Sequence, residues 1–185
     1  LWTDAISERT AALAWGDIDN DGDLDLAVGN YNAANKIYRN EGLDDQGQLM
    51  LSLYWTASGN DNTYSLAWGD ADGDGDLDLA VSNTSQANVV YFNFDGQLEI
   101  TPSWTSQDAN HARRIMWDDP DGDGDLDLTA RDTENTHIYY NQNGLSQTPT
   151  PFQLGPGNVS NGTDTGGSAS AAWVDIDRDG DLDLT

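Results

Sequence analysis

Short stretches in which apolar residues alternate with polar or small ones recur along the chain, and they predict β-strands. Leu77, Leu79 and Val81 have the period of two that is typical of a strand with one buried face. Around them, the strands expected in one unit span residues 65–68, 77–81, 88–92 and 97–104, with an Asp95-Gly96 turn before the last. No stretch has a convincing helical period. The pattern therefore predicts an all-β protein.

This four-strand unit is repeated. Trp15, Trp68, Trp117 and Trp173 mark one position in successive copies. A second series, Trp2, Trp55 and Trp104, is followed by Thr each time, and Phe152 takes its place in the last copy. Repeats of about 40 to 50 residues with four strands each indicate β-propeller blades. The expected blades span about residues 4–56, 57–105 and 106–154, with a partial fourth at 155–185. The first blade should have strands at 24–28, 36–39 and 48–55, and the third at 126–128, 136–140 and 149–154.

An aspartate-rich segment follows the first strand of every unit. It spans Asp17–Asp25, Asp70–Asp78, Asp119–Asp127 and Asp175–Asp183, and every copy reads D-x-D-x-D-G-D-L-D. Five carboxylates in nine residues repel one another, so a cation is expected among them. Calcium accepts six to eight oxygen ligands in a flexible shell, and glycine at position 6 allows the sharp turn that such a loop needs. The leucine at position 8 is expected to anchor each loop to a core.

Each loop should bind one Ca²⁺, up to four in all. Positions 1, 3, 5 and 9 are expected to give side-chain oxygens, with both oxygens at position 9, and position 7 its backbone carbonyl. The side-chain ligands are Asp17, Asp19, Asp21, Asp25, Asp70, Asp72, Asp74, Asp78, Asp119, Asp121, Asp123, Asp127, Asp175, Asp177, Asp179 and Asp183. The carbonyl donors are Asp23, Asp76, Asp125 and Asp181.

Other interpretations of the acidic segments fit less well. A solvated acidic run would not keep glycine and leucine fixed in four copies. An EF-hand needs Glu at position 12, where this chain has Val28, Val81 and Ala130. Nonapeptide calcium repeats recur every nine residues, not once per blade.

Charge and composition exclude several classes of function. Lys plus Arg total 7 and Asp plus Glu total 33, for a net charge of −26, which argues against binding nucleic acid or an anionic membrane surface. Cysteine is absent, so there are no disulfides and no thiol chemistry. No apolar run is long enough for a membrane span. The tryptophans could form a carbohydrate platform, but their fixed place in each repeat favours packing between blades.

The A-W-G-D-x-D-x-D-G-D-L-D-L-A-V pattern resembles the FG-GAP/VCBS repeat family, the calcium-loop propeller blades of integrin α-subunits and many secreted microbial proteins. Trp15-Gly16 and Trp68-Gly69 stand where the family has Phe-Gly, and Trp117-Asp118 and Trp173-Val174 depart from it. No Gly-Ala-Pro follows, so the secreted microbial members are the closer likeness. The resemblance implies a calcium-binding propeller, extracellular or at the cell surface, with about three and a half blades in this chain. The remaining blades would come from the same or another chain.

The resemblance also implies a ligand face opposite the calcium loops. That face would comprise residues 56–63, 105–113 and 160–168, with 30–35, 83–87 and 131–135. His111, Arg113 and Arg114 form its most basic and irregular part and could anchor an anionic sugar or a carboxylate. We expect a non-catalytic binding, adhesion or structural module for a protein or glycan. The alternative is the scaffold of a secreted polysaccharide-active lyase or hydrolase whose catalytic residues lie outside this segment.

Overall fold

The structure is a computed structural model that describes residues 8–107, 112–132, 135–141, 154–160, 173–174 and 183–184, the last three ranges as backbone alone. Every regular element in these ranges is a β-strand, and all pairings are antiparallel. No helix in the described part of the chain could span a membrane. The all-β prediction is confirmed.

The first sheet contains four strands in chain order. They are β1 (Thr10–Gly16), β2 (Asp25–Ala33), β3 (Lys36–Leu43) and β4 (Leu49–Thr56). Each pairs with the next, and the β1–β2 register brings Trp15 opposite Leu26 and Leu13 opposite Val28. Cross-strand partners share a face of the sheet. One face of this blade is therefore lined by apolar side chains from β1 and β2.

The second sheet repeats the pattern with a broken outer strand. It contains β5 (Asp61–Gly69), β6 (Asp78–Asn83), β7 (Val89–Tyr91) and β10 (Trp104–Thr105). The hairpin of β8 (Asn93–Phe94) and β9 (Gln97–Leu98) turns at Asp95-Gly96, both with positive φ, as the sequence predicts. The single strand expected over 97–104 is interrupted. Pro102 lies in the gap and has no N–H to donate to a neighbouring strand.

In the third sheet, the predicted position of the fourth strand was wrong. It contains β11 (Arg114–Asp118), β12 (Asp127–Arg131), β13 (Thr136–Asn141) and β14 (Leu154–Ser160). The fourth strand is expected at 149–154, and residues 155–185 are expected to form the partial fourth blade. Instead β14 pairs with β13 from Leu154 to Ser160. An edge strand tolerates proline and glycine because one of its sides needs no hydrogen-bond donors, so this Gly/Pro-rich stretch still forms a strand.

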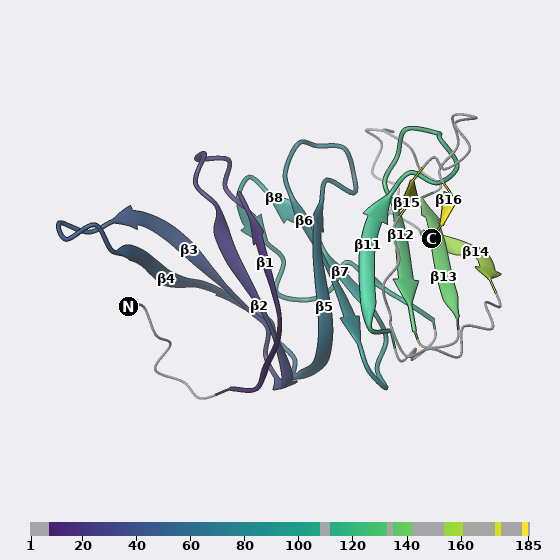
Figure 1. Ribbon diagram of the computed structural model, residues 1–185, viewed down its shortest axis with the longest axis horizontal. Coiled ribbons are helices and arrows are strands. Elements are labelled where there is room, and N and C mark those ends of the chain that lie inside the picture. Colours follow the sequence, from purple (N-terminus) through teal and green to yellow (C-terminus); the bar gives the residue numbers. More distant parts are fainter. Residues whose placement is uncertain are drawn as a thin grey trace.

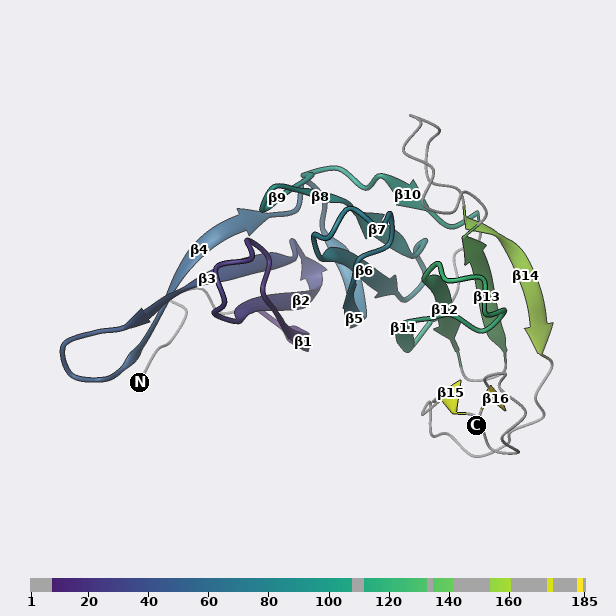
Figure 2. The ribbon, with the colours of Figure 1, turned by 90° about the horizontal axis from the view of Figure 1, so that it is seen from above.

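The sheets follow one another along the molecule, and two short strands, β15 (Trp173–Val174) and β16 (Asp183–Leu184), pair beyond them. Figure 2 shows β1, β5 and β11 on the inner side of an arc and β4, β10 and β14 on its outer side. The three loops that join β1 to β2, β5 to β6 and β11 to β12 lie together at one end of the sheets (Figure 1). This arrangement is that of successive propeller blades.

The cores lie between consecutive sheets. One cluster joins Ile18, Ala27, Ile37 and Trp55 of the first sheet to Leu79, Val81 and Tyr91 of the second, and Leu66 and Trp68 pack against it. A second cluster joins Ala71, Ala80, Val90 and Phe92 of the second sheet to Ile115, Leu128 and Tyr139 of the third, with Trp104 and Trp117 against it. Packing between blades is therefore confirmed for Trp55, Trp68, Trp104 and Trp117.

Each of these contacts follows one template. A Cβ added at Gly16 would lie 2.7 Å from the ring of Trp68, and one added at Gly69 would lie 2.6 Å from the ring of Trp117. The indole of Trp68 therefore packs against the glycine that follows Trp15 in the preceding blade, and the indole of Trp117 packs against the glycine that follows Trp68. On the outer side, Trp55 meets Tyr91 and Trp104 meets Tyr139, each edge to face with 5.1 Å between ring centroids.

Two expectations at the blade ends need correction. Leu24 does not anchor its loop to a core, because its side chain is 54% exposed on the face of the first sheet that no described blade covers. The predicted loops at 30–35 and 56–63 are partly strand. β2 continues to Ala33 and β5 begins at Asp61, because the pairs Tyr31–Asn62 and Ala33–Asp61 join the two blades.

Candidate metal sites in the aspartate loops

The three described loops share one backbone conformation. Glycine at position 6 has φ of +94° at Gly22, +97° at Gly75 and +97° at Gly124, a region that residues with a Cβ rarely adopt. Its N–H donates to the position-1 carboxylate in every loop, at 3.0 Å to Asp17, Asp70 and Asp119. The chain therefore curls around its own first aspartate, as the spacing predicts.

The curl brings three carboxylates of each loop together. The triads are Asp17, Asp19 and Asp25; Asp70, Asp72 and Asp78; and Asp119, Asp121 and Asp127. Within each, one oxygen per residue lies within 4.8 Å of the others, so each triad could hold a metal ion. These are positions 1, 3 and 9 of the predicted ligand set. Converging anions of this kind are the hard oxygen donors that Ca²⁺ takes.

The position-9 carboxylates are fully buried and built into the backbone. Asp78 is 0% exposed, and its two oxygens accept the N–H of Asn93 at 2.9 Å and of Ala71 at 2.8 Å. Asp25 accepts the N–H of Asn40 and of Ile18 in the same way. Asp25 thus ties its loop to β3, the third strand of its blade, and Asp78 ties its loop to the start of β8, which follows β7.

The sequence reading missed an asparagine that completes this arrangement. Asn141 ends β13, and Asn93 begins β8, two residues after β7. Besides its backbone N–H, each donates its side-chain amide to the preceding blade's loop. The acceptors are the carbonyls of Ile18, at 2.8 Å from Asn93, and Ala71, at 2.9 Å from Asn141. The signal was present, since Tyr-x-Asn or Tyr-Asn recurs at Asn40, Asn93 and Asn141.

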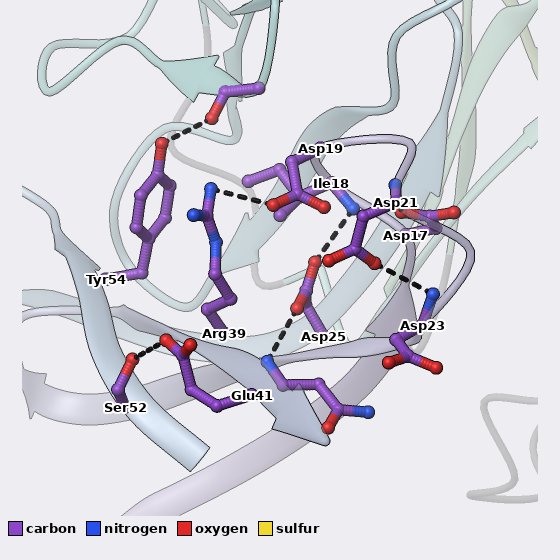
Figure 3. A network of polar contacts seen from close by, with 12 residues as sticks. Asp17, Ile18, Asp19, Asp21, Asp23, Asp25, Arg39, Glu41, Ser52 and Tyr54 are labelled. Atoms are coloured by element: carbon purple, nitrogen blue, oxygen red, sulfur yellow. Dashed lines mark hydrogen bonds and ion pairs between the residues drawn. The ribbon is translucent and has the colours of Figure 1, made fainter. Parts of the chain in front are cut away.

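The first loop differs by an ion pair. The Arg39 guanidinium lies 2.8 Å from Asp19 Oδ2 and stacks over the Tyr54 ring, 4.2 Å from its centroid. Figure 3 shows Arg39 between this ring and the loop, on the side away from Asp23. The second blade has Phe92 at the position of Arg39. One cation of the chain itself therefore partly offsets the charge of the first loop.

Two buried oxygens support a metal ion in these loops. Asp19 Oδ1 and Asp127 Oδ2 are buried and accept no hydrogen bond. A buried carboxylate oxygen without a partner is costly, and metal coordination would satisfy it. The donor set and these two oxygens fit a hard divalent cation. When bound, such an ion would supply positive charge among the carboxylates and cross-link the two ends of each loop.

Burial and crowding raise the pKa of several of these carboxyl groups in the metal-free protein. Burial, with nearby Asp72 and Asp74, raises the pKa of Asp78 from 3.8 to about 8, against the lowering effect of its two backbone hydrogen bonds. The pKa of Asp127 rises to about 7, mainly by burial, and that of Asp72 to about 6 by burial and the charge of Asp74. Without metal, the second loop therefore holds a proton on Asp78 at pH 7, and Asp127 of the third loop is about half protonated.

Calcium binding is expected to release protons at pH 7, because the ion must displace them from these carboxylates. As pH falls from 8 to 5, affinity should drop by up to about tenfold per unit for each displaced proton. Because these pKa values are higher in the folded protein, the contribution of these groups to the stability of the metal-free fold is fully present below pH 3.8. This contribution is lost as pH rises to about 8. Titration calorimetry in two buffers of different ionisation enthalpy tests this; equal heats at pH 7 would contradict it.

Other predicted ligands have varied placements. The position-5 carboxylates of Asp21, Asp74 and Asp123 lie outside the triads and accept the N–H of position 7. At position 7, the Asp76 carboxylate accepts a hydrogen bond from the Asn20 amide at 2.8 Å, which links the second blade to the first. It also accepts the Asp95 N–H of its own blade at 2.7 Å. In the fourth loop, Asp175, Asp177, Asp179 and Asp181 lie outside the described residues, and Asp183 is described only as backbone in β16.

Apart from Arg39, the basic residues of the described part of the chain lie at or near the opposite end of the sheets. Arg113 and Arg114 lie there, whereas His111 falls outside the described residues. The register pairs Arg114 with Arg131, which the sequence placed on the ligand face within 131–135 but not among the expected anchors. The equivalent pairs are Ala12–Gly29 in the first blade and Ser65–Ser82 in the second. Comparison of these cross-strand positions between the blades could have singled out Arg131 as an anchor.

Antiparallel blades, each with an acidic loop that could hold a metal ion after its first strand, define a class of repeat protein. The family model described as the FG-GAP-like repeat matches residues 17–81, 72–129 and 119–185. The chain belongs to the FG-GAP-like repeat family. No match was found among curated proteins.

Proposed function

We propose that this chain is a calcium-stabilised part of an extracellular binding module, which recognises an acidic glycan or protein at the end opposite the aspartate loops. The observation that carries this is the arginine pair Arg114–Arg131. The register places these two arginines directly opposite each other, which concentrates positive charge at one point of this face and attracts anions. The first two blades have only small residues at these positions.

The surroundings of the pair fit a carboxylate or sulfate. Arg114 and Arg113 are exposed, and the Arg113 N–H donates to the Arg131 carbonyl at 2.8 Å, which holds the backbones of these residues next to each other. The Arg131 guanidinium also reaches the Thr136 hydroxyl at 2.9 Å. Planar guanidinium groups bind two oxygens of a carboxylate or of a tetrahedral oxyanion with paired hydrogen bonds.

The charge of the chain is segregated between the two ends of the sheets. Arg9, Lys36, Arg113, Arg114 and Arg131 lie at or near the strand ends away from the loops, and of the described basic residues only Arg39 lies beside a loop. Lys36 and Arg9 are engaged locally, with Glu8 at 2.7 Å and with the ring of Tyr31. The third blade therefore offers the strongest anion site on this face.

Calcium supports the extracellular part of the proposal. Calcium loops of extracellular modules bind as weakly as about 10⁻⁴ to 10⁻³ M because the ion is abundant there, and a loop with a dissociation constant of about 10⁻⁵ M would be almost fully occupied. A module that depends on such loops would be filled with calcium outside the cell.

Replacing both arginines by the residues of the second blade tests the ligand face. The R114S/R131S variant is expected to lose binding to sulfated and uronate glycans at least tenfold on a glycan array, because its guanidinium groups are gone. Calcium content and melting temperature should stay unchanged, since Ser65 and Ser82 occupy the same pair in a folded blade. R113S should lose less, and R9S in the first blade is the control that should bind normally. Unchanged binding by R114S/R131S would place the site elsewhere.

A further inference from the structure

Buried hydrogen bonds connect the position-9 carboxylates of the three described loops in one continuous chain. At its centre, the backbone of Ala71 lies between two loops. Its N–H donates to Asp78 Oδ2 of its own loop at 2.8 Å, and its carbonyl accepts the Asn141 side-chain amide at 2.9 Å. The Asn141 N–H donates in turn to Asp127 of the third loop at 2.7 Å. Three bonds thus join the second triad to the third.

The same links join the second loop to the first. The Asn93 N–H donates to Asp78 Oδ1 at 2.9 Å, and its side-chain amide donates to the Ile18 carbonyl at 2.8 Å. The Ile18 N–H donates to Asp25 of the first loop at 3.0 Å (Figure 3). Every residue in this chain of bonds is at most 6% exposed, so water does not compete for the bonds.

The chain of bonds ends in the third loop. Position 2 of that loop is Pro120, which has no N–H to donate. Asp127 Oδ2, the oxygen equivalent to Asp78 Oδ2, is buried and accepts no hydrogen bond from the described residues. Pro120 therefore explains where the chain of bonds stops, and it shows that a loop of this type folds with proline at position 2.

We propose that this chain of bonds makes calcium binding cooperative from loop to loop, so that an ion in one triad raises the affinity of the neighbouring triad. Once Asp127 is fixed by coordination, the Asn141 N–H that it accepts is fixed as well. The Asn141 amide then holds the Ala71 carbonyl, and the Ala71 N–H orients Asp78. The second triad loses less conformational freedom when it binds its own ion, and the effect is reciprocal. The proposal rests on calcium binding by the loops and is independent of the ligand face.

A thermodynamic cycle on the full chain measures the coupling between the second and third loops. The Gly75 N–H donates to Asp70 at 3.0 Å, so its amide resonance in NMR spectra reports calcium in the second loop. D121A removes an exposed member of the third triad that lies outside the chain of bonds. Titration in trimethylamine N-oxide, which favours compact states, keeps the calcium-free protein folded. D121A is expected to weaken calcium binding at the second loop by about fivefold or more.

The A71P variant breaks the chain of bonds and removes no metal ligand. It takes the donor from Asp78 Oδ2, as Pro120 does from Asp127 Oδ2 in a loop that folds. In the A71P background, D121A is expected to change the affinity of the second loop by less than about twofold. Any effect of the lost Asp121 charge through space appears in both backgrounds and cancels.

The matched control is N20G. It removes the 2.8 Å bond from the Asn20 amide to Asp76, a contact between loops outside the chain of bonds. The new glycine is the residue that the other two loops have at this position, where Asn20, Gly73 and Gly122 all have positive φ. The effect of D121A on the second loop should survive this substitution. N141L breaks the chain of bonds at a second point and takes the place of A71P if that variant does not fold.

Two results would overturn the coupling while leaving the calcium sites intact. One is an equal effect of D121A in the unmodified and A71P backgrounds, which would mean that the loops communicate through charge or packing. The other is unchanged affinity of the second loop in D121A, although calcium still shifts the Gly75 resonance. A Gly75 resonance that does not respond to calcium in the unmodified chain would instead overturn calcium binding itself, and the coupling with it.

Discussion

Removing calcium is expected to unfold the described blades, or to lower their melting temperature by tens of degrees. At a free calcium concentration about 100 times the dissociation constant, each filled site adds about 2.7 kcal/mol to the free energy of unfolding. Three such triads then contribute about 8 kcal/mol, comparable to the total stability of about 5–15 kcal/mol that is usual for a domain. Removal also leaves three carboxylates of each loop facing one another.

Thermal unfolding followed by circular dichroism, with calcium and with EDTA, measures this effect. Magnesium at the same concentration is the control, because its rigid octahedral shell suits these loops less well and should restore much less stability. A shift of only a few degrees with EDTA would show that the loops are held by their own hydrogen bonds and that calcium is an accessory.

The sequence predicted the parts of the molecule that local chemistry fixes. Few conformations are open to a D-x-D-x-D-G-D-L-D segment once its glycine takes positive φ, as Gly22, Gly75 and Gly124 do. The conformation of these three loops was therefore predictable from the sequence. The role of Trp68 and Trp117 was equally predictable from their fixed register. Both inferences depend on repetition, which places every copy in the same surroundings.

The parts that were missed depend on contacts between blades. The side-chain amides of Asn93 and Asn141 act on the loop of another repeat, which no pattern within one repeat reveals. Leu24 has the same sequence context as Leu77 but lies exposed, because exposure depends on the neighbouring blade. Strand β14 is formed by residues with weak strand preference, and its pairing with β13 outweighs that preference.

The D78A variant is expected to be the most damaging single substitution in a loop. It would remove the acceptor of two buried backbone N–H groups, on Asn93 and Ala71, and each unsatisfied donor costs about 1–3 kcal/mol. The second loop would also lose a ligand and with it about 2.7 kcal/mol of calcium stabilisation. Together these losses amount to at least about 4 kcal/mol, close to the whole stability of a marginal domain.

The D76A variant is the matched control, two residues away in the same loop. Its carboxylate lies outside the triad and accepts the Asn20 amide and the Asp95 N–H near the surface, each worth about 0.5–1.5 kcal/mol. D76A should therefore keep the calcium stoichiometry of the unmodified chain and melt only a few degrees lower, whereas D78A should lose one calcium ion and unfold at far lower denaturant. Equilibrium dialysis against radioactive calcium, together with urea unfolding, separates the two effects. Equal calcium loss in both variants would show that the carboxylates of positions 7 and 9 contribute alike, which the buried geometry of Asp78 argues against.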